Sequence, residues 1–171
     1  MIIKVTEDMK KEALEYSQLS KEFTSRRHDH HEGGSENAAL KMYEGKIGEK
    51  AFRFWLDYNN IPYQEDETSH DSADFYDFLI KGYKIDVKTR TKSFHTRILE
   101  RVEQFEKKPK DIYVSAHYYT DIEEVKLIGV ISANRLKKLN PPESFGYEMN
   151  YFAHDYQLSS METFKSTFKK Y

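Results

Sequence analysis

The stretch Phe75-Tyr76-Asp77-Phe78-Leu79-Ile80, then Lys81-Gly82, then Tyr83-Lys84-Ile85-Asp86-Val87-Lys88, decides the fold of this chain. Two apolar and aromatic runs flank a two-residue turn that ends in glycine, which predicts a β-hairpin. With this turn, Ile80 faces Tyr83, and counting outward sets Asp77 opposite Asp86. Because side chains alternate between the two faces of a strand, Asp86 and Lys88 share one face. The register therefore predicts two carboxylates and one ammonium group together on the hairpin.

An amphipathic helix is predicted upstream of this hairpin, from Glu44 to Tyr58. Its apolar residues recur at helical spacing and form one stripe, which consists of Ile47, Ala51, Phe54, Trp55 and Tyr58. Glu49 lies at the edge of this stripe, so its carboxylate can reach over the sheet edge or point into solvent. The helix pattern alone leaves both placements of Glu49 open.

Similar patterns predict the other elements of the chain. A helix over residues 5–24 precedes a polar loop over 25–37, and a short strand at 61–64 precedes the hairpin. The later elements are a helix over Arg97–Lys108, strands at 111–118 and 125–131, a helix at 132–139 begun by Ser132, a strand within 147–158, and a last helix capped by Ser159 or Ser160. We expect one domain over residues 1–171, with an N-terminal helical arm and mobile loop (1–40), a core (44–131) and a C-terminal elaboration (132–171).

Composition narrows the class of protein. With 171 residues, 38% hydrophobic and 33% charged, the chain is long enough and apolar enough to bury a core. It has no cysteine, which excludes disulfides and thiolate zinc sites. It shows no apolar run of the roughly 20 residues that a membrane-spanning helix needs, and its first residues do not resemble a signal peptide. We expect a cytoplasmic protein without a membrane partner.

Charge is distributed unevenly although the net charge is only −2. Residues 61–80 contain six acidic side chains and no Lys or Arg, whereas residues 81–110 contain ten basic and four acidic side chains. An acidic block can hold cations, and a basic block can hold phosphates. The two blocks meet at the hairpin, so we expect a site with both signs of charge there.

The Asp86-Val87-Lys88 triplet, with Asp77 upstream and Gly48-Glu49 on the preceding helix, resembles the PD-(D/E)xK nuclease superfamily of restriction-endonuclease-like proteins. The resemblance covers roughly residues 44–131. The proline of the pattern is missing, since Tyr76 precedes Asp77, and Asp74 therefore competes with Asp77 for the first acidic position. The resemblance implies an α/β fold with an α-β-β-β-α-β core, in which a mixed central sheet is flanked by helices.

The resemblance also implies a metal-dependent nuclease that acts on DNA, most simply an endonuclease of restriction-like or junction-resolving type. Asp77, Asp86, the Val87 carbonyl and Glu49 would hold Mg²⁺, which prefers oxygen ligands, and Mn²⁺ would substitute for it. Lys88 would orient or help to deprotonate the attacking water. The alternative is a catalytically silent protein of the same fold that binds DNA or a protein partner.

Basic residues near the hairpin are the candidates for contact with DNA phosphates. We expect these contacts from Thr89, Arg90, Lys92, Arg97 and Arg101, and from Arg26 and Arg27 in the predicted loop. The segment His28–Glu32 resembles a metal-binding cluster, but it lacks a fixed set of four ligands. The sequence leaves open whether this segment binds metal, and it is compatible with a homodimer.

Overall fold

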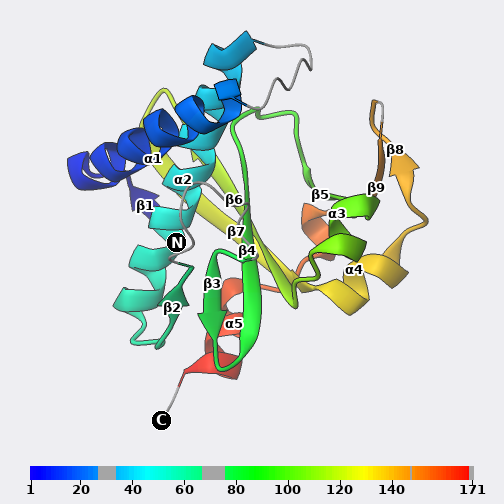
Figure 1. Ribbon diagram of the computed structural model, residues 1–171. Coiled ribbons are helices and arrows are strands. Elements are labelled where there is room, and N and C mark those ends of the chain that lie inside the picture. Colours follow the sequence, from blue (N-terminus) through cyan, green and yellow to red (C-terminus); the bar gives the residue numbers. More distant parts are fainter. Residues whose placement is uncertain (27–33, 67–75, 147, 170–171) are drawn as a thin grey trace.

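The computed structural model (Figure 1) describes residues 1–26, 34–66, 76–146 and 148–169, except for the side chains of residues 19–26 and 34–37. It is a mixed α/β structure with a curled central sheet and flanking helices. The central sheet has six strands in the order β1-β7-β6-β4-β3-β2, and a second sheet has three strands in the order β5-β9-β8. In Figure 1 the small sheet stands beside the large one, together with α3 and α4.

The predicted hairpin is present with the predicted register. Strand β3 (Phe78–Ile80) pairs antiparallel with β4 (Tyr83–Arg90), and Ile80 faces Tyr83. The turn residues Lys81 and Gly82 have φ angles of 48° and 84°, as expected for the two central positions of a type I′ turn. Asp77 lies one position beyond the ladder, where its N–H donates to the Ile85 carbonyl at 2.9 Å.

The rest of the central sheet is built around β4. Strand β6 (Ile112–Tyr119) runs parallel to β4, and β7 (Glu124–Ser132) and β1 (Ile2–Lys4) continue the sheet antiparallel. The strand predictions at 111–118 and 125–131 are therefore confirmed. The strand predicted at 61–64 is reduced to β2 (Gln64–Glu65), and β1 was not predicted.

The prediction of one helix over Arg97–Lys108 is wrong for its first five residues. Arg97–Arg101 forms strand β5, and only Val102–Lys107 forms helix α3. Burial alternates along β5, with Ile98 and Glu100 inward, because the strand pairs with β9 (Met149–His154). This strand falls within the predicted region 147–158, and it is followed by a 3₁₀ helix η1 (Asp155–Gln157) and preceded by β8 (Glu143–Ser144).

Helices cover the large sheet. Helix α1 (Glu7–Arg26) crosses α2 (Gly34–Tyr58), as the blue and cyan ribbons of Figure 1 show. Both helices extend into the region 25–37 that was predicted to be a loop, and α2 begins ten residues before Glu44. Helices α4 (Ala133–Leu139) and α5 (Met161–Phe168) begin after the N-caps Ser132 and Ser160, as predicted. None of the helices in the described ranges is both long and apolar enough to cross a membrane.

The core forms where α2 and α5 meet the sheet. Phe52 of α2 contacts Phe78 of β3 edge-on and Phe164 of α5 edge-on, with ring centroids 5.2 and 5.8 Å apart. Each of these three rings is almost fully buried. This aromatic packing fixes α2 against the hairpin, and it therefore sets the distance between Glu49 and the two aspartates.

Candidate functional site

Asp77 lies at the start of the hairpin, where the backbone of β4 holds its side chain. The Val87 N–H donates to Asp77 Oδ2 at 2.6 Å. Burial raises the pKa of Asp77 well above its usual range, and the negative charges of Glu49 and Asp86 raise it further. The carboxyl groups of Glu49 and Asp86 are therefore near enough to oppose the ionisation of Asp77.

Asp86 is buried on β4 and lies between two ammonium groups. Lys88 Nζ is 2.8 Å from Asp86 Oδ2, and Lys110 Nζ is 3.1 Å from Asp86 Oδ1. Burial acts to raise the pKa of Asp86, but the two lysines outweigh it, and the pKa is lowered. The two aspartates thus have pKa values that are pushed in opposite directions, which is a common property of functional carboxylate pairs.

Lys88 contacts a second buried carboxylate that was not among the predicted site residues. Glu100 of β5 faces β4, and its Oε2 is 2.5 Å from Lys88 Nζ. Burial acts to lower the pKa of Lys88, but Asp86 and Glu100 outweigh it and raise the pKa above its usual value. An alternating reading of Arg97–Arg101, with Glu100 on the inward face beside Ile98, would have pointed to this residue.

The Gly48-Glu49 pair combines a packing role and an electrostatic one. A Cβ atom at Gly48 would lie 1.9 Å from Thr89 Oγ1, so only glycine lets α2 approach β4 this closely. Glu49 Oε2 pairs with Lys46 Nζ at 2.5 Å. Lys46 also acts to lower the pKa of Asp77, although burial and the neighbouring carboxylates outweigh it. The structure therefore brings Glu49 into the same electrostatic group as the hairpin carboxylates.

Two of the predicted DNA-contacting residues are engaged in contacts within the protein. Arg90 makes a two-pronged pair with Asp155, with nitrogen–oxygen distances of 2.8 and 2.5 Å. Thr89 Oγ1 donates to the Gly45 carbonyl at 3.3 Å. Both side chains are only partly exposed, so β4 uses them to hold α2 and η1 in place.

Lys92, Arg97 and Arg101, which were also predicted to contact phosphates, are exposed. Lys92 lies in the loop after β4, and the Arg97 guanidinium lies 4.0 Å above the ring of Phe145. Arg101 pairs with Glu148 at 2.8 Å. Arg26 is the last residue of α1. Asp74, Arg27 and the His28–Glu32 segment lie outside the described residues.

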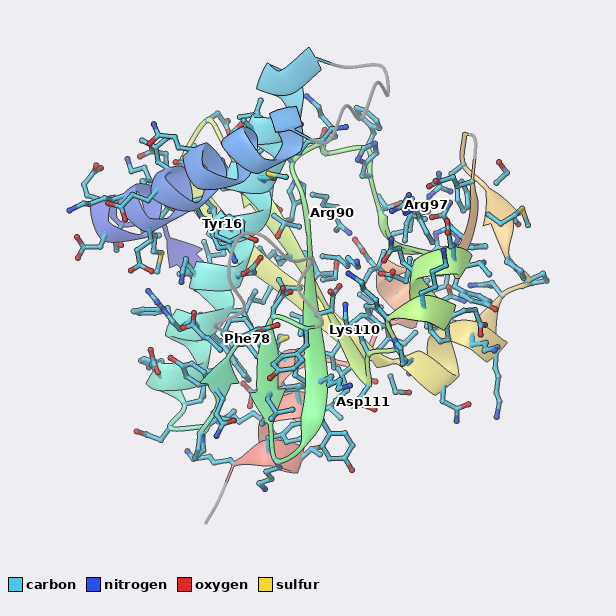
Figure 2. The ribbon with its side chains drawn as sticks, in the orientation of Figure 1. Tyr16, Phe78, Arg90, Arg97, Lys110 and Asp111 are labelled. Carbon is cyan, nitrogen blue, oxygen red and sulfur yellow. The ribbon has the colours of Figure 1, made fainter. Side chains whose placement is uncertain are left out.

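A pocket of about 480 Å³ opens between the two sheets beside Lys88. Its basic lining residues are Lys88 and Arg90 from β4, His95 from the following loop and Arg97 from β5, and Phe145 adds an aromatic wall. Figure 2 shows Arg90 and Arg97 on the two segments that border this region, with Lys110 lower down beside β4. The pocket is thus concave, has four basic side chains among its lining residues, and includes the lysine of the DxK triplet.

The carboxylates fit a hard divalent cation in their chemistry, since Mg²⁺ and Mn²⁺ prefer carboxylate and carbonyl oxygens. Their arrangement does not form a ligand set as it stands. Within the described ranges, no group of three or more His, Asp or Glu side chains is arranged to hold a metal ion. The ammonium groups of Lys88 and Lys110 face the Asp86 oxygens instead. A metal ion at Asp86 would therefore have to displace at least one of these lysines.

No protein-family model, curated protein or solved structure matches the chain. The geometry of the site is therefore the basis for assigning a function. It provides two carboxyl groups with opposed pKa shifts, an ammonium group held between two carboxylates, and a basic pocket that opens onto that ammonium group. Such an arrangement can place positive charge beside an anionic group and orient a water next to it.

Proposed function

We propose that this chain is a metal-dependent nuclease that hydrolyses phosphodiester bonds in DNA and has a restriction-endonuclease-like core. The observation that carries the proposal is the hairpin register, which brings Asp77, Asp86 and Lys88 together next to Glu49. The activity that fits this site best is that of an endonuclease of restriction-like or junction-resolving type.

The order of elements supports this proposal. Helix α2, strands β2, β3 and β4, helix α3 and strand β6 follow one another in the α-β-β-β-α-β order that the resemblance implies. Strands β4 and β6 are parallel, and the crossover between them contains α3. Strand β5 is an insertion before α3, and it brings the small sheet and Glu100 to the site.

Asp77, Asp86, the Val87 carbonyl and Glu49 are the groups that would hold Mg²⁺ or Mn²⁺. When bound, the ion lowers the pKa of a water and neutralises charge on the scissile phosphate. The raised pKa of Lys88 keeps its ammonium group protonated near neutral pH. Lys88 therefore acts as a hydrogen-bond donor that orients water or a phosphate oxygen, and not as a general base.

Incubation of supercoiled plasmid with Mg²⁺, Mn²⁺ or EDTA tests the proposal. We expect nicking or linearisation with either ion and none with EDTA. Asp77→Asn and Asp86→Asn should each reduce the rate by several orders of magnitude, because each removes an anionic ligand. Asp121→Asn, in the exposed turn before β7, is the matched control and should cleave like the unmodified protein. Cleavage that persists in EDTA, or in both site variants, would contradict the proposal.

A second candidate function is a catalytically silent protein of this fold that binds DNA or a protein partner. The observation that favours it is the pairing of Asp86 with both Lys88 and Lys110, which leaves no assembled metal group in the described part of the chain. Thermal unfolding separates the two candidates. A metal-binding site stabilises the folded protein when Mg²⁺ is added, and Asp86→Asn should abolish this increase. A silent protein would show no increase and no cleavage.

A further inference from the structure

Two strongly exposed aromatic side chains are sequence neighbours of residues tied to the basic pocket: Phe94 precedes His95, which lines the pocket, and Tyr156 follows Asp155, the partner of Arg90. Phe94 is 74% exposed in the loop between β4 and β5, and Tyr156 is 83% exposed in η1. A backbone hydrogen bond connects the two segments, in which the Asp155 N–H donates to the Thr96 carbonyl at 3.0 Å. We refer to Phe94 and Tyr156 as the aromatic rim. Large exposed rings are costly to leave in water, so a paired occurrence beside a pocket indicates a binding surface.

Each ring of the aromatic rim is backed by a histidine. His154 stacks on Tyr156 with ring centroids 5.4 Å apart and an interplanar angle of 6°. His95 packs edge-on to Phe94 with centroids 4.6 Å apart. A supported ring loses less conformational freedom when a ligand stacks on it, so both rings are better platforms than isolated side chains.

The pocket next to the aromatic rim supplies positive charge. His95 connects the pocket to the aromatic rim, because it lines the pocket and contacts Phe94. Lys88 and Arg97 line the same pocket, and Lys92 belongs to the same loop as Phe94. The charge of Arg90 is matched by Asp155, so Lys92 and Arg97 are the cations that remain most accessible to phosphates. Aromatic platforms beside a basic groove are the combination that binds single-stranded nucleic acid.

We propose that the aromatic rim stacks unpaired nucleobases, so that the substrate of the site is single-stranded or branched DNA. In an intact duplex both faces of each base are covered by its neighbours, whereas an unpaired strand can place bases on Phe94 and Tyr156. The strand backbone then follows Lys92 and Arg97 into the pocket toward Lys88. This inference rests on the proposed nuclease function for its choice of DNA, although the binding it describes does not require cleavage.

The test is a fluorescence-anisotropy titration of a labelled oligothymidine and of a duplex of equal length, in EDTA so that no turnover occurs. Phe94→Ala and Tyr156→Ala should each weaken single-strand binding by about fivefold or more, which is the low end of base–aromatic stacking. Duplex affinity should change much less. Tyr156→Phe and Phe94→Trp keep a stacking ring and should retain single-strand affinity.

Tyr58→Ala is the matched control. Tyr58 is also a strongly exposed aromatic residue, but it ends α2 and belongs neither to the loop between β4 and β5 nor to η1, and it does not line the pocket. This variant should bind both probes normally. Single-strand affinity that is unchanged in the Phe94→Ala/Tyr156→Ala double variant would overturn the inference, and so would a loss that is equal for duplex and single strand.

Cleavage of supercoiled plasmid and of a single-stranded DNA circle by the same proteins, with Mg²⁺, is measured separately. A protein that cleaves duplex plasmid but binds oligothymidine independently of the aromatic rim would disprove this inference and leave the nuclease proposal intact. A protein that binds oligothymidine through the aromatic rim but cleaves no DNA would support the stacking surface and contradict the nuclease proposal. If the rim joins copies of this chain instead, the double variant would sediment differently without any loss of single-strand affinity, and the inference would fail.

Discussion

Lys88 of the large sheet and Glu100 of the small sheet form an ion pair that joins the two sheets. The pair connects β4 to β5, with Lys88 Nζ 2.5 Å from Glu100 Oε2. The side chain of Glu100 is only 7% exposed, whereas that of Lys88 is 35% exposed toward the pocket. This geometry holds Lys88 between Asp86 and Glu100 while part of its side chain lines the pocket.

Replacement of Glu100 should therefore lower stability and not only activity. Glu100→Gln leaves the Lys88 ammonium with one carboxylate fewer, and we expect a loss of about 1–3 kcal/mol in the free energy of unfolding, less than for a fully buried pair because Lys88 is partly solvated. Glu148→Gln is the control, since Glu148 pairs with Arg101 at an exposed position. That loss should stay below about 1 kcal/mol. Urea denaturation measures both, and equal losses would contradict the structural role of Glu100.

Replacement of each hairpin aspartate by asparagine should change the free energy of unfolding in opposite directions. Asp77→Asn replaces a carboxyl whose ionisation is opposed by burial, Glu49 and Asp86, and the amide oxygen can still accept the Val87 N–H. This variant should be as stable as the unmodified protein or more stable at neutral pH. Asp86→Asn leaves two ammonium groups without their shared carboxylate and should be less stable. Urea unfolding at neutral pH compares the variants. Destabilisation of both would contradict the conclusion that burial opposes the charge of Asp77 while two lysines stabilise that of Asp86.

The pH dependence of stability follows from the same pKa shifts. The folded-state pKa of Asp77 is raised above its unfolded value of about 3.9, so its contribution to stability increases as the pH falls through the folded pKa. The folded-state pKa of Asp86 is lowered, so its contribution is present above about pH 3.9 and is lost as the pH falls through the folded pKa. Urea unfolding measured across the acid range checks both effects. The gain in stability on acidification should be absent in Asp77→Asn, and the loss of the Asp86 contribution should be absent in Asp86→Asn.

Two glycines of helix α2 provide a matched pair for packing. Gly48→Ala would place a methyl group against Thr89, and we expect a loss of about 1–3 kcal/mol from overpacking. Gly45→Ala meets nothing within 4 Å and should be neutral or stabilise the helix by up to about 1 kcal/mol. Combining Gly48→Ala with Thr89→Ala should recover part of the loss. If both single variants have the same stability, the close approach of α2 to β4 is not what requires glycine.

The hairpin could be predicted from the sequence because its information is local. The turn Lys81-Gly82 sets the register, and the alternation of β4 then places Asp86 and Lys88 on one face. The N-caps Ser132 and Ser160 are equally local signals. These features depend on residues within a few positions of one another, so no knowledge of the tertiary structure was needed.

The parts that could not be predicted depend on distant partners. The apolar spacing of Ile98, Val102 and Phe105 fits a helix, but residues 97–101 become a strand because β9, about fifty residues later in the chain, pairs with them. Glu100 becomes a site residue only through this pairing. In the same way, Arg90 pairs with Asp155 and Asp86 with Lys110, contacts that no spacing rule reveals.

Arg90 and Arg97, which were both predicted to contact phosphates, should contribute differently to DNA binding. Arg97→Ala removes an exposed cation at the pocket, and we expect the slope of log K against log salt for DNA binding to fall in magnitude by about one. Arg90→Ala removes a cation already matched by Asp155, so the slope should hardly change. The same variant should instead lose about 1–3 kcal/mol of stability, because Asp155 is left without its partner. Binding titrations at several salt concentrations in EDTA, with urea unfolding of the same proteins, measure both quantities. An unchanged slope for Arg97→Ala together with a reduced slope for Arg90→Ala would mean that DNA displaces Asp155 and binds deeper between the sheets.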